Sequence, residues 1–380
     1  MARRRGQFGR RGMLGWAGLS AVAGIGTAGL VQCSAENTAD ARPLGLTSRG
    51  GWAFPQPNPI IKAGDMRSQG LWNDPCVLHD GTSYIMYLTS STSAPFKPPV
   101  LPFRAVSPDG LAWSLSPATP LLSPAGTPFA SLETPSVVRF RGAWHMFFTG
   151  IMARPNPAPM SVGHAVSADG ITWKVTPQPV LTATGKITDW NGYLVAEPGA
   201  IVWKDRMLVY FAAIGARPGG NPPQAQSIGL AITTDGVTFG PPSRVLEQAP
   251  LYPPSRGFIG YSTPMAFALG NKVHLVYDVA VNWTGDDPEW QQVALHHAVS
   301  NRDGEGDFVQ DAAPLMTRDD FDWTGGEIAS PTVLVEGSKL HMWFAGHVHK
   351  SQLGPLIRRG ISGREFGIGY ATRPAADFER

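Results

Sequence analysis

Five residues that each precede a proline carry the groups in this sequence that could do chemistry. The five X-Pro pairs recur at intervals of 60, 63, 66 and 67 residues, and their first members are Asp74, Thr134, Glu197, Thr263 and Ser330. Two of these residues are carboxylic acids and three carry hydroxyl groups. Two carboxyl groups that flank one glycosidic bond can hydrolyse it, one as proton donor and the other as nucleophile or base.

The sequence around the two acids predicts different roles for them. Glu197 follows the apolar run 194–196, and apolar surroundings raise the pKa of a carboxyl group and keep it protonated. Asp74 follows Asn73, whose amide could hydrogen-bond a carboxylate or a sugar hydroxyl. We therefore expect Asp74 and Glu197 to be a catalytic pair. The alternative is that both acids cap strand entries or bind a central cation.

The elements that would position these acids form an internal repeat. Each unit has a short apolar strand after the proline, a second and a third strand, an Asp-Gly turn and a fourth strand. The turn is clearest in the segments 105–110, 165–170 and 231–236. Four antiparallel strands in about 60 residues are typical of a propeller blade. The sequence predicts an all-β, five-bladed propeller, closed by residues 56–62 as the outer strand of the last blade.

Composition excludes other fold classes. The 380 residues include 44 glycines and 35 prolines, and only 16% are charged. Disordered chains carry more charge, and glycine and proline destabilise long helices. These counts favour a large, turn-rich β protein.

The N-terminus resembles an export signal. Arg10-Arg11 resembles a twin-arginine motif, the run 13–31 is small and apolar, and Cys33-Ser34-Ala35 offers a cleavage site. We expect a signal peptide at 1–35, a linker at 36–50 and the propeller at 51–380, with export to the cell envelope or the medium and no stable membrane span after cleavage. A permanent membrane anchor and a lipid on Cys33 are the alternatives.

Charge and motif content limit the partners. The formal net charge is +2 and the main basic cluster lies in the leader, so no nucleic-acid partner is expected. The CxxC and HExxH spacings that are typical of zinc sites do not occur in the sequence. We expect a monomer without a cofactor. The loop 286–289 could clamp a structural calcium ion, but a solvated turn is favoured.

Five blades with Asp-Pro opening the first and Glu-Pro opening the third resemble the five-bladed furanosidase-type glycosidases. These are the arabinanases, xylosidases and arabinofuranosidases of glycoside hydrolase family 43 and the fructosidases of family 32. The resemblance covers residues 52–378, and Trp72-Asn73-Asp74-Pro75 is similar to the Trp-x-Asn-Asp-Pro segment of fructosidases, without the glycine expected shortly afterwards.

The resemblance implies that Asp74 is the nucleophile or base, that Glu197 is the general acid and that a third acid assists them. That third acid is open. Glu133 is displaced by one residue from the position of Thr134, and Glu197 could itself be the third acid, in which case Glu327 or Asp287 would donate the proton.

The sequence thus predicts an exported glycoside hydrolase that acts on a furanose- or pentose-containing polysaccharide, with an arabinan favoured. Trp72, Trp190 and Tyr261 are predicted to stack on sugar faces, and the other predicted substrate-binding residues are Asn73, Glu133, Thr263 and Glu327. A non-catalytic sugar-binding propeller is one alternative. A glycoside phosphorylase is another, although its phosphate would have only Arg256, His347, His349 and Lys350 to bind it.

Overall fold

The chain folds into strands joined by short turns. The structure is a computed structural model that describes residues 44–67, 71–91, 99–154, 159–186, 188–216, 224–283, 289–347 and 366–379. Within these ranges it has strands and short 3-10 helices but no α-helix, so the all-β prediction is confirmed. No helix in the described part is long and apolar enough to cross a membrane. The predicted signal peptide at 1–35, with Cys33, lies outside these residues.

The strands follow the five repeats predicted from the sequence. Repeat 1 holds β1 (Asn73–His79), β2 (Tyr84–Ser91), β3 (Val100–Ser107) and β4 (Ser114–Leu115). Repeat 2 holds β5 (Phe129–Phe140), β6 (Ala143–Met152), β7 (Met160–Ser167) and β8 (Trp173–Val175). Repeat 3 holds β9 (Leu194–Trp203), β10 (Arg206–Ala216), β11 (Gln224–Thr233) and β12 (Ser243–Leu246). Repeat 4 holds β13 (Phe258–Leu269), β14 (Lys272–Trp283), β15 (Glu289–Ser300), β16 (Phe308–Gln310) and β17 (Met316–Thr317). Repeat 5 holds β18 (Glu327–Glu336), β19 (Lys339–His347) and β20 (Gly367–Pro374).

Within each repeat, consecutive strands pair in antiparallel fashion. Repeats 1 and 2 are separate four-stranded sheets, and the described part of repeat 5 is a three-stranded sheet. Repeats 3 and 4 are joined into one nine-stranded sheet by a single parallel contact between Gln226 and Gly260. The predicted pattern of four strands is therefore confirmed for most of the repeats. Repeat 4 differs because two short strands, β16 and β17, pair with different parts of β15.

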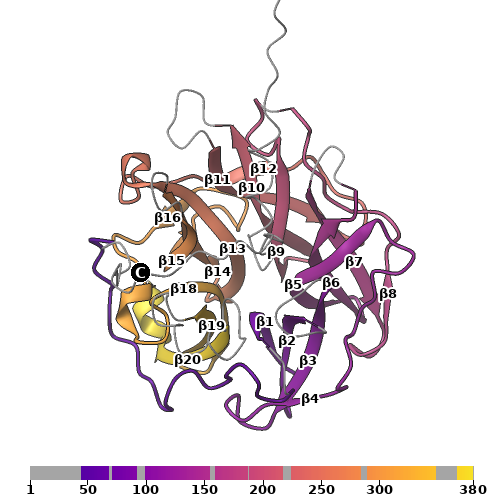
Figure 1. Cartoon of the computed structure of the whole chain (residues 1–380), viewed down its shortest axis with the longest axis horizontal. Coiled ribbons are helices and arrows are strands. Elements are labelled where there is room, and N and C mark those ends of the chain that lie inside the picture. Colours follow the sequence, from indigo (N-terminus) through magenta and orange to yellow (C-terminus); the bar gives the residue numbers. More distant parts are fainter. Residues whose placement is uncertain are drawn as a thin grey trace, which may run out of the picture.

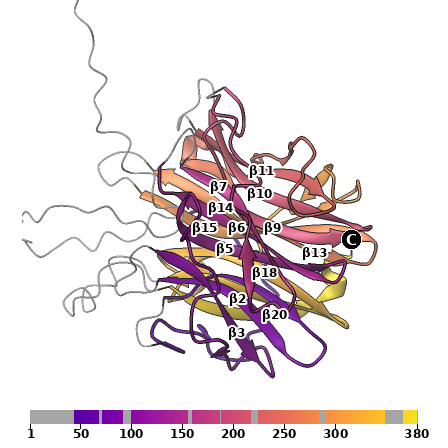
Figure 2. The same cartoon turned by 90° about the vertical axis from the view of Figure 1, so that its right-hand side faces the viewer.

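The first strand of every repeat lies towards the middle of the molecule, and the later strands lie farther out (Figure 1). Viewed from the side, the strands run across the body from one face to the other (Figure 2). All five first strands line one cavity of about 360 Å³ with residues that follow their prolines, namely 76–78, 137–139, 200–202, 265–268 and 332–335. The five X-Pro pairs are therefore gathered at one end of this cavity.

The Asp-Gly turns pack each repeat against its neighbour. In the first three repeats the turn has the same hydrogen bonds: a Ser or Thr hydroxyl accepts the Gly N–H, and the Asp carboxylate accepts two later N–H groups. In repeats 1, 2 and 4 the carbonyl of the turn glycine accepts a hydrogen bond from an aromatic side chain of the adjacent repeat: Gly110 from Trp343, Gly170 from Tyr87 and Gly304 from Tyr210. The turn of repeat 1 thus contacts repeat 5.

The N-terminal segment of the described chain runs along the last strand. Ala53 pairs with Thr372 and Ile61 pairs with Ile368, both in antiparallel orientation. Backbone hydrogen bonds of 2.8 to 2.9 Å join Ala53 to Thr372 in both directions. These contacts lie beside β20, where the sequence predicts that residues 56–62 form an outer strand.

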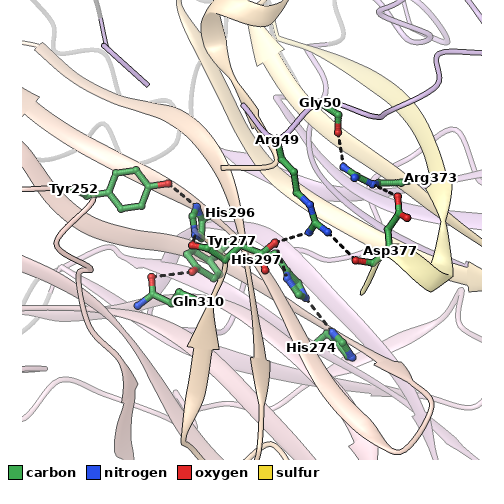
Figure 3. A network of polar contacts seen from close by, with 11 residues as sticks. Arg49, Gly50, Tyr252, His274, Tyr277, His296, His297, Gln310, Arg373 and Asp377 are labelled. Carbon is green, nitrogen blue, oxygen red and sulfur yellow. Dashed lines mark hydrogen bonds and ion pairs between the residues drawn. The ribbon is translucent and has the colours of Figure 1, made fainter. Parts of the chain in front are cut away.

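A polar network fastens the two ends of the described chain to repeat 4 (Figure 3). Arg49 forms an ion pair with Asp311 at 2.8 Å and donates a second hydrogen bond to the carbonyl oxygen of Asp377. Asp377 in turn accepts a hydrogen bond from Arg373 of β20 at 2.7 Å. Asp311 also contacts His297 at 3.2 Å. One arginine therefore ties the N-terminal segment to both repeat 4 and the C-terminus.

We predict that Arg49→Ala lowers the free energy of unfolding by about 2 kcal/mol, since it removes two hydrogen bonds that involve a charged group. Arg141→Ala is the matched control, because the Arg141–Asp205 ion pair has side chains that are 55% and 78% exposed. That variant should lose less than about 0.5 kcal/mol. Urea denaturation measures both values. Equal losses in the two variants would contradict the fastening role of Arg49.

Candidate active site

The five residues before the prolines share one unusual backbone conformation. Their φ angles are 52° for Asp74, 52° for Thr134, 54° for Glu197, 44° for Thr263 and 50° for Ser330. Each lies at a bulge where the register between the first and second strands shifts. A left-handed residue that is not glycine costs about 1–3 kcal/mol, and such strain is typical of functional sites. A bulge also re-aims side chains.

Hydroxyl groups of two other repeats hold the Asp74 carboxylate. Ser330 Oγ donates to Asp74 Oδ1 at 2.7 Å, and Thr134 Oγ1 donates to Asp74 Oδ2 at 3.3 Å. Asp74 is only 3% exposed. Burial raises the pKa of Asp74 above the ordinary value of a carboxyl group, and the hydrogen bonds from Ser330, Thr89 and Thr134 reduce this rise without cancelling it. These donors stabilise the ionised form of Asp74.

Glu197 has fewer donors than Asp74. Its Oε2 accepts the backbone N–H of Thr263 at 3.1 Å, and its own N–H donates to Thr149 Oγ1 at 2.6 Å. Burial raises the pKa of Glu197 well above its ordinary value, and the charge of Asp278 adds to that rise. Because Oε2 faces an N–H donor, the proton of the neutral acid belongs on Oε1.

Asp278 is a residue of this site that the sequence analysis missed. It lies on β14, the second strand of repeat 4, and is completely buried. Its Oδ2 accepts hydrogen bonds from Thr263 Oγ1 at 2.5 Å and from the Ser330 N–H at 3.1 Å, and its Oδ1 accepts one from the Ser262 hydroxyl. The available signal was a single acid inside the apolar run 275–281.

These contacts link all five repeats. Hydrogen bonds run from Thr134 to Asp74, from Ser330 to Asp74 and to Asp278, and from Thr263 to Asp278 and to Glu197. The structure therefore brings together Asp74, Glu197 and Thr263, which the sequence analysis selected from distant parts of the chain.

Two further buried acids lie near this hydrogen-bonded chain. Glu133 is 1% exposed, and its Oε2 has no hydrogen-bond partner among the described residues. Burial, followed by the charges of Asp74 and Glu197, raises the pKa of Glu133 well above its ordinary value. Glu327 lies opposite His347 and contacts its Nε2 at 3.1 Å. Repeats 1 to 5 thus contribute one acid each.

Two of the three predicted stacking platforms are wrong, and the third, Trp190, stacks its ring on Phe211. Trp72 is fully buried between sheets, where its ring packs edge-on against Phe103 and its indole N–H donates to the carbonyl oxygen of Asp65. Tyr261 is also fully buried, and its hydroxyl donates to Gln310 at 2.5 Å. Both rings fill the hydrophobic core and leave no face for a sugar.

Asn73 lies next to Asp74 at the start of β1. It pairs with Thr89 across the strands, and its Oδ1 is buried without a hydrogen-bond partner among the described residues. Asp287, His349, Lys350 and most of the 286–289 loop lie outside the described residues. Across the described part of the chain, no group of three or more His, Cys, Asp or Glu side chains is arranged to hold a metal ion.

The fold is similar to that of known sugar-processing enzymes. A thermostable family-43 glycoside hydrolase superposes with a TM-score of 0.61 at 15% identity, over 82% of this chain and 91% of that one. An exo-1,5-α-L-arabinanase from a bovine ruminal metagenomic library gives 0.52 at 15%, over 78% and 92%. A β-1,2-mannobiose phosphorylase from Listeria innocua gives 0.60 at 10%, over 86% and 97%.

The chain has the fold of these enzymes. The resemblance predicted from its sequence is confirmed at the level of structure. By sequence, no family model and no curated protein matches the chain. At these identities the likeness establishes the fold alone, so the chemistry must be argued from the side chains described above.

The raised pKa of Glu197 predicts that this residue destabilises the folded protein at neutral pH. An unfolded glutamate loses its proton near pH ~4.3, whereas the folded protein holds it to higher pH, so the contribution to stability falls as pH rises through that window. We expect Glu197→Gln to raise the Tm by about 2 °C or more at pH 8. The gain should be smaller at pH 5.

Thermal denaturation at both pH values measures this effect. The control is Glu247→Gln, the same change at a side chain that is 64% exposed, and its Tm difference from wild type should not depend on pH. A Glu197→Gln variant that is no more stable than wild type at pH 8 would contradict the burial of a strained acid at this position.

Proposed function

We propose that this protein is a glycoside hydrolase in which Glu197 is the general acid and Asp74 is the nucleophile or general base. The observation that carries the proposal is that two buried carboxyl groups differ in their hydrogen-bond donors. Asp74 accepts hydrogen bonds from two hydroxyl groups, whereas among the described residues no hydroxyl group donates to Glu197 Oε1 and one N–H donates to Oε2. Paired carboxyls with pKa values pushed apart suit acid–base chemistry.

The roles of the two carboxyls follow from these contacts. The proton on Glu197 Oε1 would pass to the glycosidic oxygen as the bond to the leaving group breaks. Asp74, whose ionised form Ser330 and Thr134 stabilise, would attack the anomeric carbon or take a proton from the attacking water. Glu133 and Glu327 would border the sugar.

We further propose that the substrate is a furanose- or pentose-containing polysaccharide, with an arabinan favoured. The similarity of the fold to an arabinanase and to a xylan β-1,4-xylosidase supports this choice. The similarity to a phosphorylase keeps phosphorolysis as the second candidate. Asp74, whose ionised form Ser330 and Thr134 stabilise, favours hydrolysis, because its charge would repel a phosphate anion.

The remaining predictions from the sequence stand as parts of the same proposal. The five repeats would be the blades of one closed propeller, supported by the pairing of residues 53 and 61 with β20 and by the contact between Gly110 and Trp343. The protein would be exported by the twin-arginine-type signal peptide at 1–35. It would act as a monomer, without a cofactor, in the cell envelope or medium.

A reducing-sugar screen over arabinan, xylan and fructan tests the proposed function. We expect the wild type to release sugar from one of them without added phosphate, and Asp74→Asn and Glu197→Gln to lower kcat by about 10²-fold or more. Glu247→Gln is the matched control and should retain wild-type activity. Activity that depends on inorganic phosphate would favour the phosphorylase, and near-full activity of either variant would refute the assigned pair.

A substrate with a better leaving group distinguishes the role of Glu197 from that of Asp74. A nitrophenyl glycoside needs little protonation of its leaving oxygen, so we expect Glu197→Gln to recover much of its lost rate on this substrate. Asp74→Asn should remain slow, since its defect lies at the anomeric carbon. Recovery in Asp74→Asn instead would reverse the assignment.

A further inference from the structure

A groove of about 750 Å³ lies on the outer edge of repeat 5, and none of the buried acids of the candidate site lines it. One wall is the N-terminal segment 54–58, and the other is the loop 320–323 that precedes β18. Segment 54–58 lies between the pairings that Ala53 and Ile61 make with β20, the strand of this sheet farthest from β18. The indigo N-terminal segment follows the outer edge of the molecule, whereas the first strands lie towards the middle (Figure 1). The groove is therefore separate from the candidate active site.

Aromatic rings form a row along this groove. The rings of Phe54 and Phe321 meet edge to face at 5.2 Å, and the ring of Phe321 lies 6.3 Å from that of Trp323. Trp323 in turn stacks on Phe344 of β19 at 5.7 Å. Phe54 is 43% exposed. Exposed apolar side chains that gather in a concave surface with polar groups around them are typical of a binding site.

Carboxylate and amide groups border the aromatic row. Asp320 is already engaged, since its Oδ2 accepts the N–H of Thr317 at 2.7 Å and its Oδ1 accepts the hydroxyl of Ser48 at 3.2 Å. The side chains of Gln56 and Asp322 are exposed and have no hydrogen-bond or ion-pair partner within the described ranges. Both can accept hydrogen bonds from a ligand, and the Gln56 amide can also donate them.

Both walls of the groove are held in place by the rest of the fold. Asn58 exchanges two hydrogen bonds with the backbone of Tyr370, at 3.0 and 2.6 Å. In the loop, Thr324 Oγ1 donates to the carbonyl oxygen of Arg318 at 2.8 Å, and Arg318 is completely buried. A ligand that enters a preformed groove loses less free energy to the ordering of the protein.

The chemistry of the walls favours a neutral ligand that carries hydroxyl groups. Of the described residues that line the groove, only Asp320 and Asp322 are charged, and their carboxylates would repel phosphates, nucleic acids and acidic sugars. Pro55 and Pro57 have no N–H, so this wall offers few backbone donors for pairing with a peptide strand. Aromatic rings can pack against the apolar C–H face of a sugar, and carboxylates accept hydrogen bonds from its hydroxyl groups.

We propose that this groove is a second binding site, which holds a neutral polysaccharide outside the candidate active site. Phe54 would pack against a sugar ring, and Gln56 and Asp322 would bind its hydroxyl groups. The choice of a polysaccharide rests on the proposed function, but binding in the groove requires no turnover. A polymer held at the edge of the molecule would be present at a higher local concentration for the acids near the centre.

Native gel electrophoresis of the purified full chain, with soluble arabinan, xylan or fructan in the gel, tests this inference. We expect at least one of these polysaccharides to retard the wild type. Phe54→Ala should raise the polysaccharide concentration that halves the mobility by about threefold to tenfold, because it removes an aromatic contact. Phe54→Trp should stay close to wild type. Asp322→Asn should weaken retardation by a smaller factor, since its amide oxygen still accepts a hydrogen bond.

Ile171→Ala is the matched control, because Ile171 is an apolar side chain of similar exposure, 40%, beside the Asp-Gly turn of repeat 2. This variant should be retarded like the wild type. Polygalacturonate, an acidic polysaccharide, should affect the wild type and Phe54→Ala equally, because the groove would repel it. Equal retardation of Phe54→Ala and wild type by every neutral polysaccharide would overturn the inference, and so would a wild type that none of them retards.

The gel also separates this inference from the proposed function. If the wild type cleaves none of the polysaccharides but Phe54→Ala loses retardation, the second site is supported and the hydrolase is refuted. If the wild type cleaves one of them but Phe54→Ala is retarded equally, only the second site is refuted. If sedimentation shows a wild-type dimer that Phe54→Ala converts to a monomer, the groove is a contact between two copies and the inference is wrong.

Discussion

The site depends on the burial of several carboxyl groups, one from each repeat, away from water. In such surroundings each charge acts strongly on the next, and each must find a hydrogen-bond donor or keep its proton. Asp74 accepts hydrogen bonds from hydroxyl groups of repeats 2 and 5, whereas no described hydroxyl group donates to the Glu197 carboxyl group. The neighbours therefore stabilise the ionised form of Asp74 more than that of Glu197, although both acids occupy the same place in their repeats.

The repeated fold supplies this arrangement five times and then varies it. Each first strand has a bulge at its X-Pro pair, with a positive φ that is unfavourable for these residues. At three of the five positions a second strand provides the acceptor for the N–H of the strained residue, through Thr89, Thr149 and Asp278. The Asp-Gly turns then pack one repeat on the next. The same backbone conformation thus recurs in every repeat and carries side chains that differ from one repeat to the next.

The repeat, the strands and the gathering of Asp74, Glu197 and Thr263 were predictable, because proline and Asp-Gly pairs mark strand entries and turns by local chemistry. Asp278 was missed, since its only signal is a single acid inside an apolar strand and the meaning of that signal depends on the register between strands. The prediction for Trp72 and Tyr261 was wrong because a residue near the start of a first strand can face either the site or the neighbouring sheet. Only the packing, with Phe103 and Gln310, decides between them.

A crystal structure of Glu197→Gln with a bound oligosaccharide substrate tests the central claim most directly. The account predicts that the glycosidic oxygen lies within hydrogen-bond distance of the side chain at position 197 and that the anomeric carbon faces Asp74. A sugar chain bound with its scissile bond away from both residues, in a variant shown to bind substrate in solution, would contradict it.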